Sequence, residues 1–277
     1  MKIDKAKIKK IIKRALKEDI ASGDITTNAI IKKDAKAIGR FLVKSDGVIC
    51  GLSIAKMVFE ELDKDISFKT FCKDGDFVKA GTIAAKVKGS ERTLLTGERT
   101  ALNFIQRLSG IASMVHSYSE KLKGTSTQLL DTRKTVPGLR MLDKYAVKTG
   151  GGKNHRIGLF DMVLIKDNHI KAAGSITNAI SLIQKKYGNK FIIEVETKNL
   201  DEVREALETK ADIIMLDNMN KEMMKEAVKI ISKKAKTEAS GNITIDNIAE
   251  AASTGVDFIS VGALTHSVKA LDISMKI

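Results

Sequence analysis

Six short apolar segments in the C-terminal half of the chain alternate with stretches of helical pattern, and this rhythm limits the fold more than any other feature. The apolar segments begin near Gln128, Met162, Phe191, Ile213, Lys236 and Phe258. Helical patterns lie between them at 139–149, 175–186, 200–209, 221–232 and 245–254. Such alternation predicts a parallel sheet. Short successive units without a Rossmann glycine fingerprint favour a β/α barrel over an open sheet, although six units are fewer than the usual eight.

The region from 36 to 90 follows a different pattern, in which four short strand-like segments are separated by turn signals such as Ser45-Asp46-Gly47. The segments read AIGRFLV, GVICGL, ISFKTFC and GTIAAKV. A helical piece at 53–62 interrupts them, and a longer helical pattern runs from Ser90 to about Leu122. This region predicts a small α/β domain with a mostly antiparallel sheet.

The N-terminal segment 2–20 is basic and amphipathic, with Ile8, Ile11, Ile12, Ala15 and Leu16 on one stripe. A membrane-surface helix or a targeting peptide has a similar pattern. A signal peptide needs a longer apolar run, and a transit peptide is richer in Ser and Arg. We therefore expect an ordinary first helix whose Ile stripe packs on the domain.

The charge balance bears on the class of partner. The formal net charge is +14, which either serves solubility through a lysine-rich surface or attracts a polyanion. Aromatic residues make up only 4%, and no stacking motif for nucleic acid is present, so we expect no nucleic-acid partner. No apolar run approaches the roughly 18 residues of a membrane span. The two cysteines, Cys50 and Cys72, form no disulfide framework, and a cytoplasmic location fits best.

Polar residues or glycine follow each of the six strand candidates, where β/α barrels place their active sites. These ends are 131–134, 166–169, 194–196, 217–218, 238–242 and Gly262. Arg133, Lys134, Arg156 and Lys166 are cations suited to carboxylates or phosphates. The charges of Lys144, Lys148 and Lys153 are expected on the surface or in loops, and Arg140 could face either way.

The acids and glycines at the remaining ends suggest further roles. Glu196 and Asp217 form an acid/base pair, a site for a hard metal ion, or ion pairs with nearby cations. Ser240, Gly241, Asn242 and Gly262 end the last two strands, where barrels often bind phosphate. The alternative for these four is turn chemistry alone.

No protein nucleophile stands out. The sequence has no G-x-S-x-G motif, and its four histidines lack zinc-ligand spacing. Lys166 follows an apolar strand, so a Schiff-base role is an alternative for it. The glycine triplet at 150–152 fails P-loop spacing and is interpreted as a helix C-cap followed by a loop.

At this point the residues closely resemble one family of type II phosphoribosyltransferases, quinolinate phosphoribosyltransferase, also called nicotinate-nucleotide pyrophosphorylase (carboxylating). The matching stretches cover most of the chain from residue 90 onward, and GDITT at 23–27 fits the N-terminal region. They are LLTGERTALNFIQRLSGIAS (94–113), DTRKTVPGLRMLDKYAVKTGGGKNHRIGLFDMVLIKDNHI (131–170), IEVET (193–197), IIMLDN (213–218), EASGNIT (238–244) and GVDFISVGALTHS (255–267).

The resemblance implies a fold and an assembly. It implies an N-terminal α/β sandwich domain at 1–112 and a C-terminal β/α barrel of six or seven strands at 113–267. The tail 268–277 could pack on the first domain. It also implies a homodimer in which the N-terminal region of one subunit covers the barrel of the other.

The reaction implied by the resemblance transfers phosphoribosyl from phosphoribosyl pyrophosphate to quinolinate, giving nicotinate mononucleotide, diphosphate and CO₂ in de novo NAD biosynthesis. By this resemblance, the quinolinate ligands are Arg133, Lys134, His155, Arg156 and Lys166, with Arg99 reaching across from the partner subunit. Glu196 and Asp217 contact the ribose hydroxyls and Mg²⁺, in part through water, and Ser240, Gly241, Asn242 and Gly262 cradle the 5′-phosphate. Lys134, Lys166, Glu196 and Asp217 are the expected catalytic residues.

Two competing hypotheses remain at this point. The first is a related barrel phosphoribosyltransferase with a different acceptor, which the 131–170 block argues against. The second is a polyanion-binding protein that uses the positive charge. Asn242 stands where many relatives carry a second glycine, which leaves the details of the phosphate loop open.

Overall fold

The computed structural model describes residues 4–277, which divide into two compact units. The first unit comprises the chain up to His116 together with 135–151 and 265–277, and the second comprises 117–134 and 152–264. Residues 2 and 3 of the predicted N-terminal helix lie outside the described residues. The predicted domains 1–112 and 113–267 are continuous stretches, whereas both compact units are assembled from separate segments.

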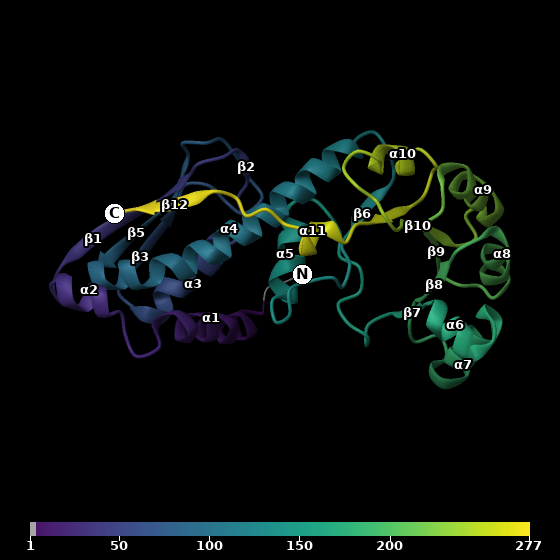
Figure 1. Cartoon of the computed structure of the whole chain (residues 1–277), viewed down its shortest axis with the longest axis horizontal. Coiled ribbons are helices and arrows are strands. Elements are labelled where there is room, and N and C mark those ends of the chain that lie inside the picture. Colours follow the sequence, from purple (N-terminus) through teal and green to yellow (C-terminus); the bar gives the residue numbers. More distant parts are fainter. Residues whose placement is uncertain (1–3) are drawn as a thin grey trace. The chain divides into compact units, whose positions relative to one another are not determined.

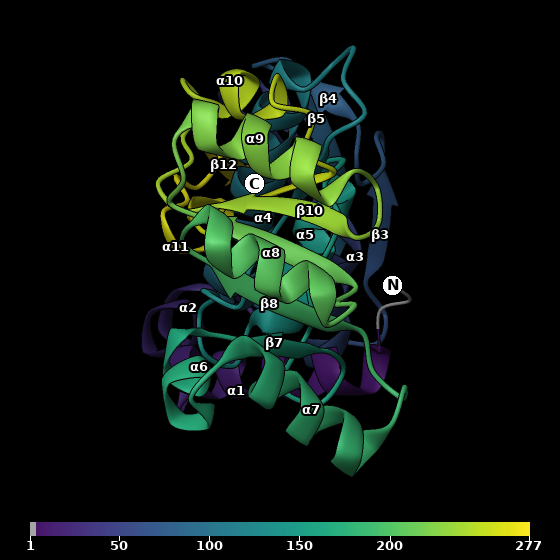
Figure 2. The same ribbon diagram turned by 90° about the vertical axis from the view of Figure 1, so that its right-hand side faces the viewer.

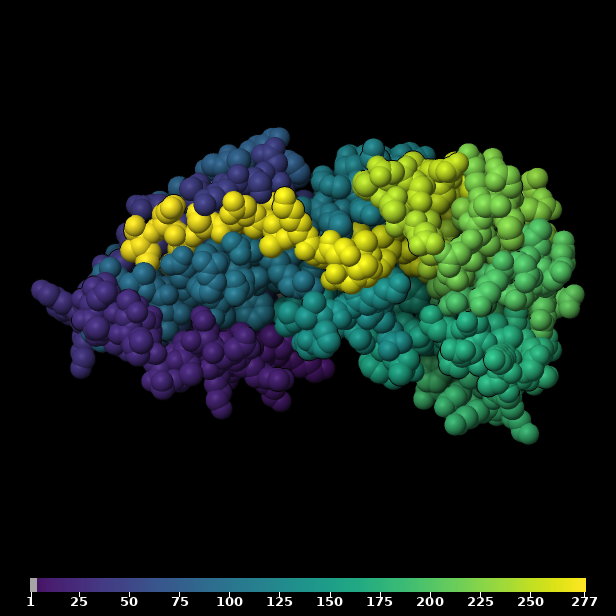
Figure 3. Space-filling view, in the orientation of Figure 1, coloured from purple at the N-terminus to yellow at the C-terminus, as the bar shows by residue number. Residues whose placement is uncertain are grey.

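An antiparallel sheet of four strands, in the order β12-β1-β5-β3, organises the first unit (Figure 1). All four strand segments expected between 36 and 90 are present, although GVICGL is a strand only at its first two residues. The strands are β1 (Lys36–Val43), β3 (Ser67–Thr70), β5 (Ile83–Ser90) and β12 (Ile273–Lys276), and β2 (Gly47–Val48) pairs separately with β4 (Phe77–Val78). The tail therefore contributes an edge strand next to β1, and the yellow atoms in Figure 3 run along this unit.

The N-terminal amphipathic segment forms a packed helix. The helices of the first unit are α1 (Lys5–Ile20), α2 (Ile25–Ile30), α3 (Leu52–Leu62), α4 (Glu91–Lys121, whose last turn belongs to the second unit) and α5 (Arg140–Thr149). The side chain of Asp4 accepts hydrogen bonds from two backbone amides at the start of α1. Ile8, Ile12 and Leu16 are buried, and α1 contacts α3. Among residues 4–277, no helix has both the length and the low polarity that crossing a bilayer requires.

Helix α5 packs closely on α4 within the first unit. Gly150 forms its C-cap, as predicted, and a Cβ at Gly150 would lie 2.4 Å from the carbonyl oxygen of Ala112. Asp143 is fully buried and pairs with Arg107 at 2.9 Å. The expectation that Lys144 is a surface charge is wrong, because its side chain is fully buried. Three consecutive residues, 142–144, are buried, so α5 is covered on more than one side.

Six parallel strands form the sheet of the second unit, in the order β6-β11-β10-β9-β8-β7. Each of the six predicted strands is present. They are β6 (Gln128–Leu130), β7 (Val163–Ile165), β8 (Ile193–Thr197), β9 (Ile213–Asp217), β10 (Lys236–Ser240) and β11 (Phe258–Ser260). A single parallel bridge joins Leu130 to Lys153 beside β6. The expected barrel of six or seven strands is thus realised with six.

Helices cover the outer face of this sheet, and Figure 2 shows α7, α8 and α9 in front of the strands. The helices are α6 (Asp167–Ala173), α7 (Ile176–Tyr187), α8 (Leu200–Glu208), α9 (Lys221–Ile231), α10 (Ile248–Ala252) and α11 (Ala263–His266, which continues into the first unit). Helix α6 was not predicted, because the polar residues after β7 were interpreted only as the end of a strand. None of its residues is buried, so it carries no apolar periodicity that a sequence could reveal.

Candidate functional site

The polar residues that end the strands belong to the second unit and meet at one edge of its sheet. Asp217 at the end of β9 stands opposite Ser240 at the end of β10. The hydroxyl of Ser260, at the end of β11, donates to the Ser240 hydroxyl at 3.1 Å. Because all six strands are parallel, their carboxyl ends lie on the same side. This edge is the candidate site.

Lys166 and Glu196 join the ends of β7 and β8. The Lys166 Nζ lies 3.0 Å from the Glu196 Oε2. The Glu196 side chain is 12% exposed and the Lys166 side chain 47%, so a small ligand can reach both groups. His169 accepts from the backbone N–H of Lys166 at 3.0 Å and so fixes the start of α6. The Lys166–Glu196 ion pair therefore joins a lysine predicted to bind a substrate carboxylate to a glutamate predicted to bind the ribose or a metal ion.

Arg133 and Arg156 bring two positive charges together. Arg156 is buried, and its Nη1 donates to the carbonyl oxygen of Met162 at 3.1 Å. Burial, and next the positive charge of Arg133, lower the pKa of the Arg156 guanidinium. The Nε of Arg133 is also buried and has no hydrogen-bond partner among residues 4–277. Two guanidinium groups with an unsatisfied buried donor are what a binding site for a carboxylate or phosphate requires.

Asp131 holds the segment that carries His155 and Arg156. Its carboxylate is fully buried and accepts from the Asn154 side chain and from the His155 backbone N–H, each at 2.8 Å. The backbone N–H of Lys153 donates to the Leu129 carbonyl at 2.8 Å. These bonds hold residues 153–155 against the end of β6. The sequence pointed to Asp131 only as part of a strand end and suggested no role for it.

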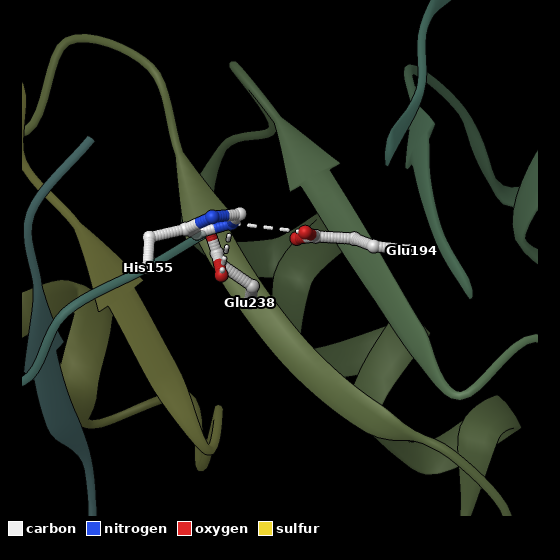
Figure 4. Close-up of side chains that lie close together, drawn as sticks. All are labelled: His155, Glu194 and Glu238. Carbon is white, nitrogen blue, oxygen red and sulfur yellow. Dashed lines mark ion pairs between the residues drawn. The ribbon is translucent and has the colours of Figure 1, made fainter. Parts of the chain in front are cut away.

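His155 points inward at two acids, Glu194 of β8 and Glu238 of β10 (Figure 4). Its Nε2 lies 2.9 Å from the Glu194 Oε2 and 3.6 Å from the Glu238 Oε2. The Nδ1 accepts from the backbone N–H of Arg156 at 2.8 Å. Both glutamates are fully buried, and the His155 side chain is 8% exposed. Among the described residues these three side chains are grouped closely enough to hold a metal ion.

Burial dominates the proton affinity of the two acids. It raises the pKa of Glu194 to about 7 and that of Glu238 to about 8. The charge of Glu194 raises the pKa of Glu238 further, and His155 opposes that increase. The cluster therefore retains protons near neutral pH. Sequence reasoning missed its role, although an acid flanked by apolar residues within a strand, as Glu194 is in IEVET, was a visible signal.

The raised pKa of Glu238 predicts that the folded chain becomes less stable as pH rises. The folded protein keeps this proton up to about pH 8, whereas the unfolded chain releases it near the ordinary pKa of 4.5. Stability contributed by the proton is complete below pH 4.5 and is lost between pH 4.5 and 8, at a limiting slope of about 1.4 kcal/mol per pH unit. Urea unfolding at a series of pH values should show this slope. Glu238→Gln should reduce it, and an unchanged slope would contradict the assignment.

Two asparagines join Asp217 to the loop after β10. Asn242 donates from Nδ2 to the Asn218 Oδ1 at 2.9 Å, and Asn218 donates from Nδ2 to the Asp217 Oδ2 at 3.0 Å. Gly241 has φ +92°, and a Cβ there would lie 2.3 Å from the Asn218 Oδ1. Asn242 adopts a left-handed φ of 52°, which asparagine tolerates better than most residues. Asn242 thus fits its turn and gains a side-chain contact that a glycine would lack.

The remaining predicted residues lie in different places. Gly262 follows β11 and is half-buried. Lys134 is exposed after β6, where its backbone N–H donates to the Thr132 hydroxyl. Arg99 is exposed on α4 of the first unit and forms no hydrogen bond or ion pair with residues 4–277. Arg140 belongs to the first unit, where its Nε donates to Thr135.

Comparison with known proteins covers nearly the whole chain. The family described as "Quinolinate phosphoribosyl transferase, C-terminal domain" matches residues 111–276, and its N-terminal domain matches residues 24–109. A curated relative from Oryza sativa subsp. japonica, named "Nicotinate-nucleotide pyrophosphorylase [carboxylating], chloroplastic", is 46% identical over 98% of this chain and 77% of its own length.

Two solved structures are also similar. NadC from Streptococcus pyogenes has a TM-score of 0.97 and 42% identity, covering 100% of this chain and 98% of that one. The nicotinate-nucleotide pyrophosphorylase from Francisella tularensis has a TM-score of 0.94 and 43% identity, covering 99% and 97%. The fold of both units is therefore shared with these proteins over essentially their full lengths.

Proposed function

The chain belongs to the quinolinate phosphoribosyltransferase family, and from this premise we propose that it transfers phosphoribosyl from phosphoribosyl pyrophosphate to quinolinate, with loss of CO₂. The products are nicotinate mononucleotide, CO₂ and diphosphate, and the reaction serves NAD biosynthesis. The observation that carries the proposal is the pair of guanidinium groups, Arg133 and Arg156, at the carboxyl end of a β/α barrel that matches this family along its length.

Quinolinate is a dianion, and the cations at the ends of β6 and β7 suit its two carboxylates. Arg133 and Arg156 present planar donors, and the unsatisfied Nε of Arg133 gains an acceptor when a carboxylate arrives. Lys134 and Lys166 add positive charge at the same edge. His155 belongs to this group by resemblance, although both its ring nitrogens already face partners within the chain.

Phosphoribosyl pyrophosphate would occupy the other side of the same edge. Glu196 and Asp217 end neighbouring strands and suit the ribose hydroxyls. The loop residues Ser240, Gly241, Asn242 and Gly262 would hold the 5′-phosphate through backbone N–H groups. Gly241 has φ +92°, a conformation that favours glycine, and a residue without a side chain allows its backbone to approach an anion closely.

Glu196 and Asp217 also suit Mg²⁺, directly or through water. They supply carboxylate oxygens at a partly exposed edge, and Mg²⁺ commonly takes one or two carboxylates together with substrate phosphate and water. When bound, the ion would neutralise charge on the diphosphate leaving group. Lys166 faces Glu196 at 3.0 Å and could move to a substrate carboxylate when the cation site fills.

The proposed chemistry needs no protein nucleophile. The pyridine nitrogen attacks C1 of the ribose, and positive charge develops on the ring as the bond to diphosphate breaks. The carboxylates of Glu196 and Asp217 face that charge, while Lys134 and Lys166 face the negative groups. Electrostatic placement of this kind accounts for the missing nucleophile in the sequence.

The assembly and the compartment are part of the proposal. Arg99 is exposed and unpaired among residues 4–277, which supports its acting in the site of a second copy of the chain. We therefore propose a homodimer with two shared sites. Free Cys50 and Cys72 support a reducing compartment, for which we propose the cytoplasm, although the name of the rice relative places that protein in the chloroplast.

The proposal is tested by mixing the protein with quinolinate, phosphoribosyl pyrophosphate and Mg²⁺ and measuring CO₂ and diphosphate. Both products should appear in equal amounts. Nicotinate lacks one carboxylate and would leave part of the cationic site unpaired, so its kcat/KM should be roughly 10⁴-fold lower. A folded protein that released neither product would contradict the proposal. A panel of other aromatic acceptors separates it from a related transferase, and weak, salt-sensitive DNA binding dismisses a polyanion-binding role.

A further inference from the structure

The imidazole of His155 is fixed from both sides. Its Nδ1 accepts the backbone N–H of Arg156, so this nitrogen carries no proton in that contact. A neutral imidazole then carries its proton on Nε2, which faces the carboxylates of Glu194 and Glu238 at 2.9 and 3.6 Å. The ring thus faces the acids of two strands, β8 and β10 (Figure 4), and its other nitrogen accepts from the backbone N–H of Arg156.

This arrangement is suited to hydrogen bonding rather than to a metal ion. Metal-bound histidines usually donate a hydrogen bond from the ring nitrogen that does not bind the metal. Here that nitrogen accepts one, so a metal on Nε2 would have to displace the single ring proton. The four carboxylate oxygens of Glu194 and Glu238 are fully buried and make no hydrogen bond of ideal geometry within residues 4–277. The ring nitrogen Nε2 of His155 lies 2.9 Å from one of these oxygens and can donate to it.

We propose that Glu194 and Glu238 are positioning residues for the quinolinate site, which hold His155 from inside the barrel and, through it, the backbone of Arg156. This inference rests on the proposed function. Neither glutamate touches substrate, and their effect reaches it through His155 and Arg156.

The need for such an anchor follows from the charges at the site. Arg133 and Arg156 repel one another when no anion is bound, and Arg156 is buried. A loop that bears a buried guanidinium moves away from a like charge unless its backbone is held. Asp131 holds the His155 N–H, and the imidazole holds the next amide along the chain. Anchored in this way, the two guanidinium groups stay in place for a carboxylate.

The experiment compares Glu194→Ala and Glu238→Ala with the corresponding Gln variants. Glutamine keeps an oxygen that accepts from Nε2 and nearly fills the volume of glutamate, whereas alanine removes the acceptor. We expect the alanine variants to raise the KM for quinolinate at least about tenfold with little change in the KM for phosphoribosyl pyrophosphate. The glutamine variants should restore most of this loss. Glu205→Ala, on α8 outside the cluster, is the matched control and should leave both KM values unchanged.

A second readout does not depend on activity. Nitrogen-15 NMR of the labelled protein should show His155 protonated at Nε2 and unprotonated at Nδ1. Hydrogen exchange of the Arg156 amide should be slow in the wild type and in the glutamine variants and at least tenfold faster in the alanine variants. If the enzyme assay gives no product from quinolinate, the proposed function fails, and these two measurements still decide the positioning role.

Three results would overturn the inference. The first is an alanine variant in which both KM values rise together as the melting temperature falls, which indicates general damage. The second is a His155 ring protonated at Nδ1, which excludes the bond to Arg156. The third is a stoichiometric metal ion in the purified protein that Glu238→Gln removes, which would make the cluster a metal site.

Discussion

Lys166→Ala is expected to lower kcat/KM for quinolinate roughly a thousandfold, because this side chain connects both halves of the proposed site. Its Nζ lies 3.0 Å from Glu196 and at the edge where the substrate carboxylates would bind. Truncating one partner of a hydrogen-bonded charge pair costs about 2–5 kcal/mol, because the substrate carboxylate is then left without its cation. Every 1.4 kcal/mol or so corresponds to a tenfold change in rate. Steady-state kinetics with each substrate varied in turn would measure the effect.

The matched control is Lys171→Ala, a replacement of the same kind within α6, at an exposed lysine. It should leave kcat/KM within about twofold of wild type, because distant surface charges are largely screened by salt. If Lys166→Ala retained more than a tenth of the activity, Lys166 would not hold a substrate carboxylate, and the proposed division of the site would need revision.

Mixing Arg99→Ala chains with Lys166→Ala chains of the proposed homodimer is expected to restore enzyme activity that each variant alone has lost. Arg99→Ala and Lys166→Ala homodimers should each be almost inactive, because every site in each lacks one cation. A heterodimer of the two variants has one site that lacks both residues and one site that is intact. Since random mixing makes half of the dimers heterodimers, activity should return to roughly a quarter of the wild-type value. Unfolding and refolding the two chains together allows them to exchange, and the rise in activity is measured afterwards.

Two results would contradict this sharing of sites. If the mixture stayed inactive although mass spectrometry showed heterodimers, Arg99 would not act across an interface. If the Arg99→Ala homodimer were fully active, the exposed arginine on α4 would have no role in the reaction. Mixing either variant with itself is the control, because it forms no new kind of dimer.

The barrel could be predicted from sequence because its strands are short and alternate with helical patterns, and because the last three strands begin at nearly equal intervals, at Ile213, Lys236 and Phe258. In a parallel sheet the carboxyl ends of all strands lie at one edge, so polar residues at these ends are predicted to lie close together. Asp217 and Ser240 are 23 positions apart in sequence, yet the register places them side by side. Such a contact can be predicted from the position of each residue at the end of its own strand, because all the strands run in the same direction.

Other features depend on contacts between distant segments that no local pattern encodes. Glu194 and Glu238 gain their meaning only from His155, which lies on a third segment. Lys144 looks like a surface charge in the sequence and is buried because α5 is covered on more than one side. A role for Arg99 came from resemblance alone, since the residue has no partner among residues 4–277.

The pairing of β1 with β12 has a consequence for the order in which the protein can form during synthesis. Residue 40 stands opposite residue 276, so the first sheet lacks an edge strand until every strand of the barrel has left the ribosome. The barrel strands β6 to β11 pair only with one another and can assemble beforehand. A chain truncated after β11 would therefore contain every strand of the barrel but would leave the N-terminal sheet with an open edge, the kind of surface on which chaperones and aggregation act.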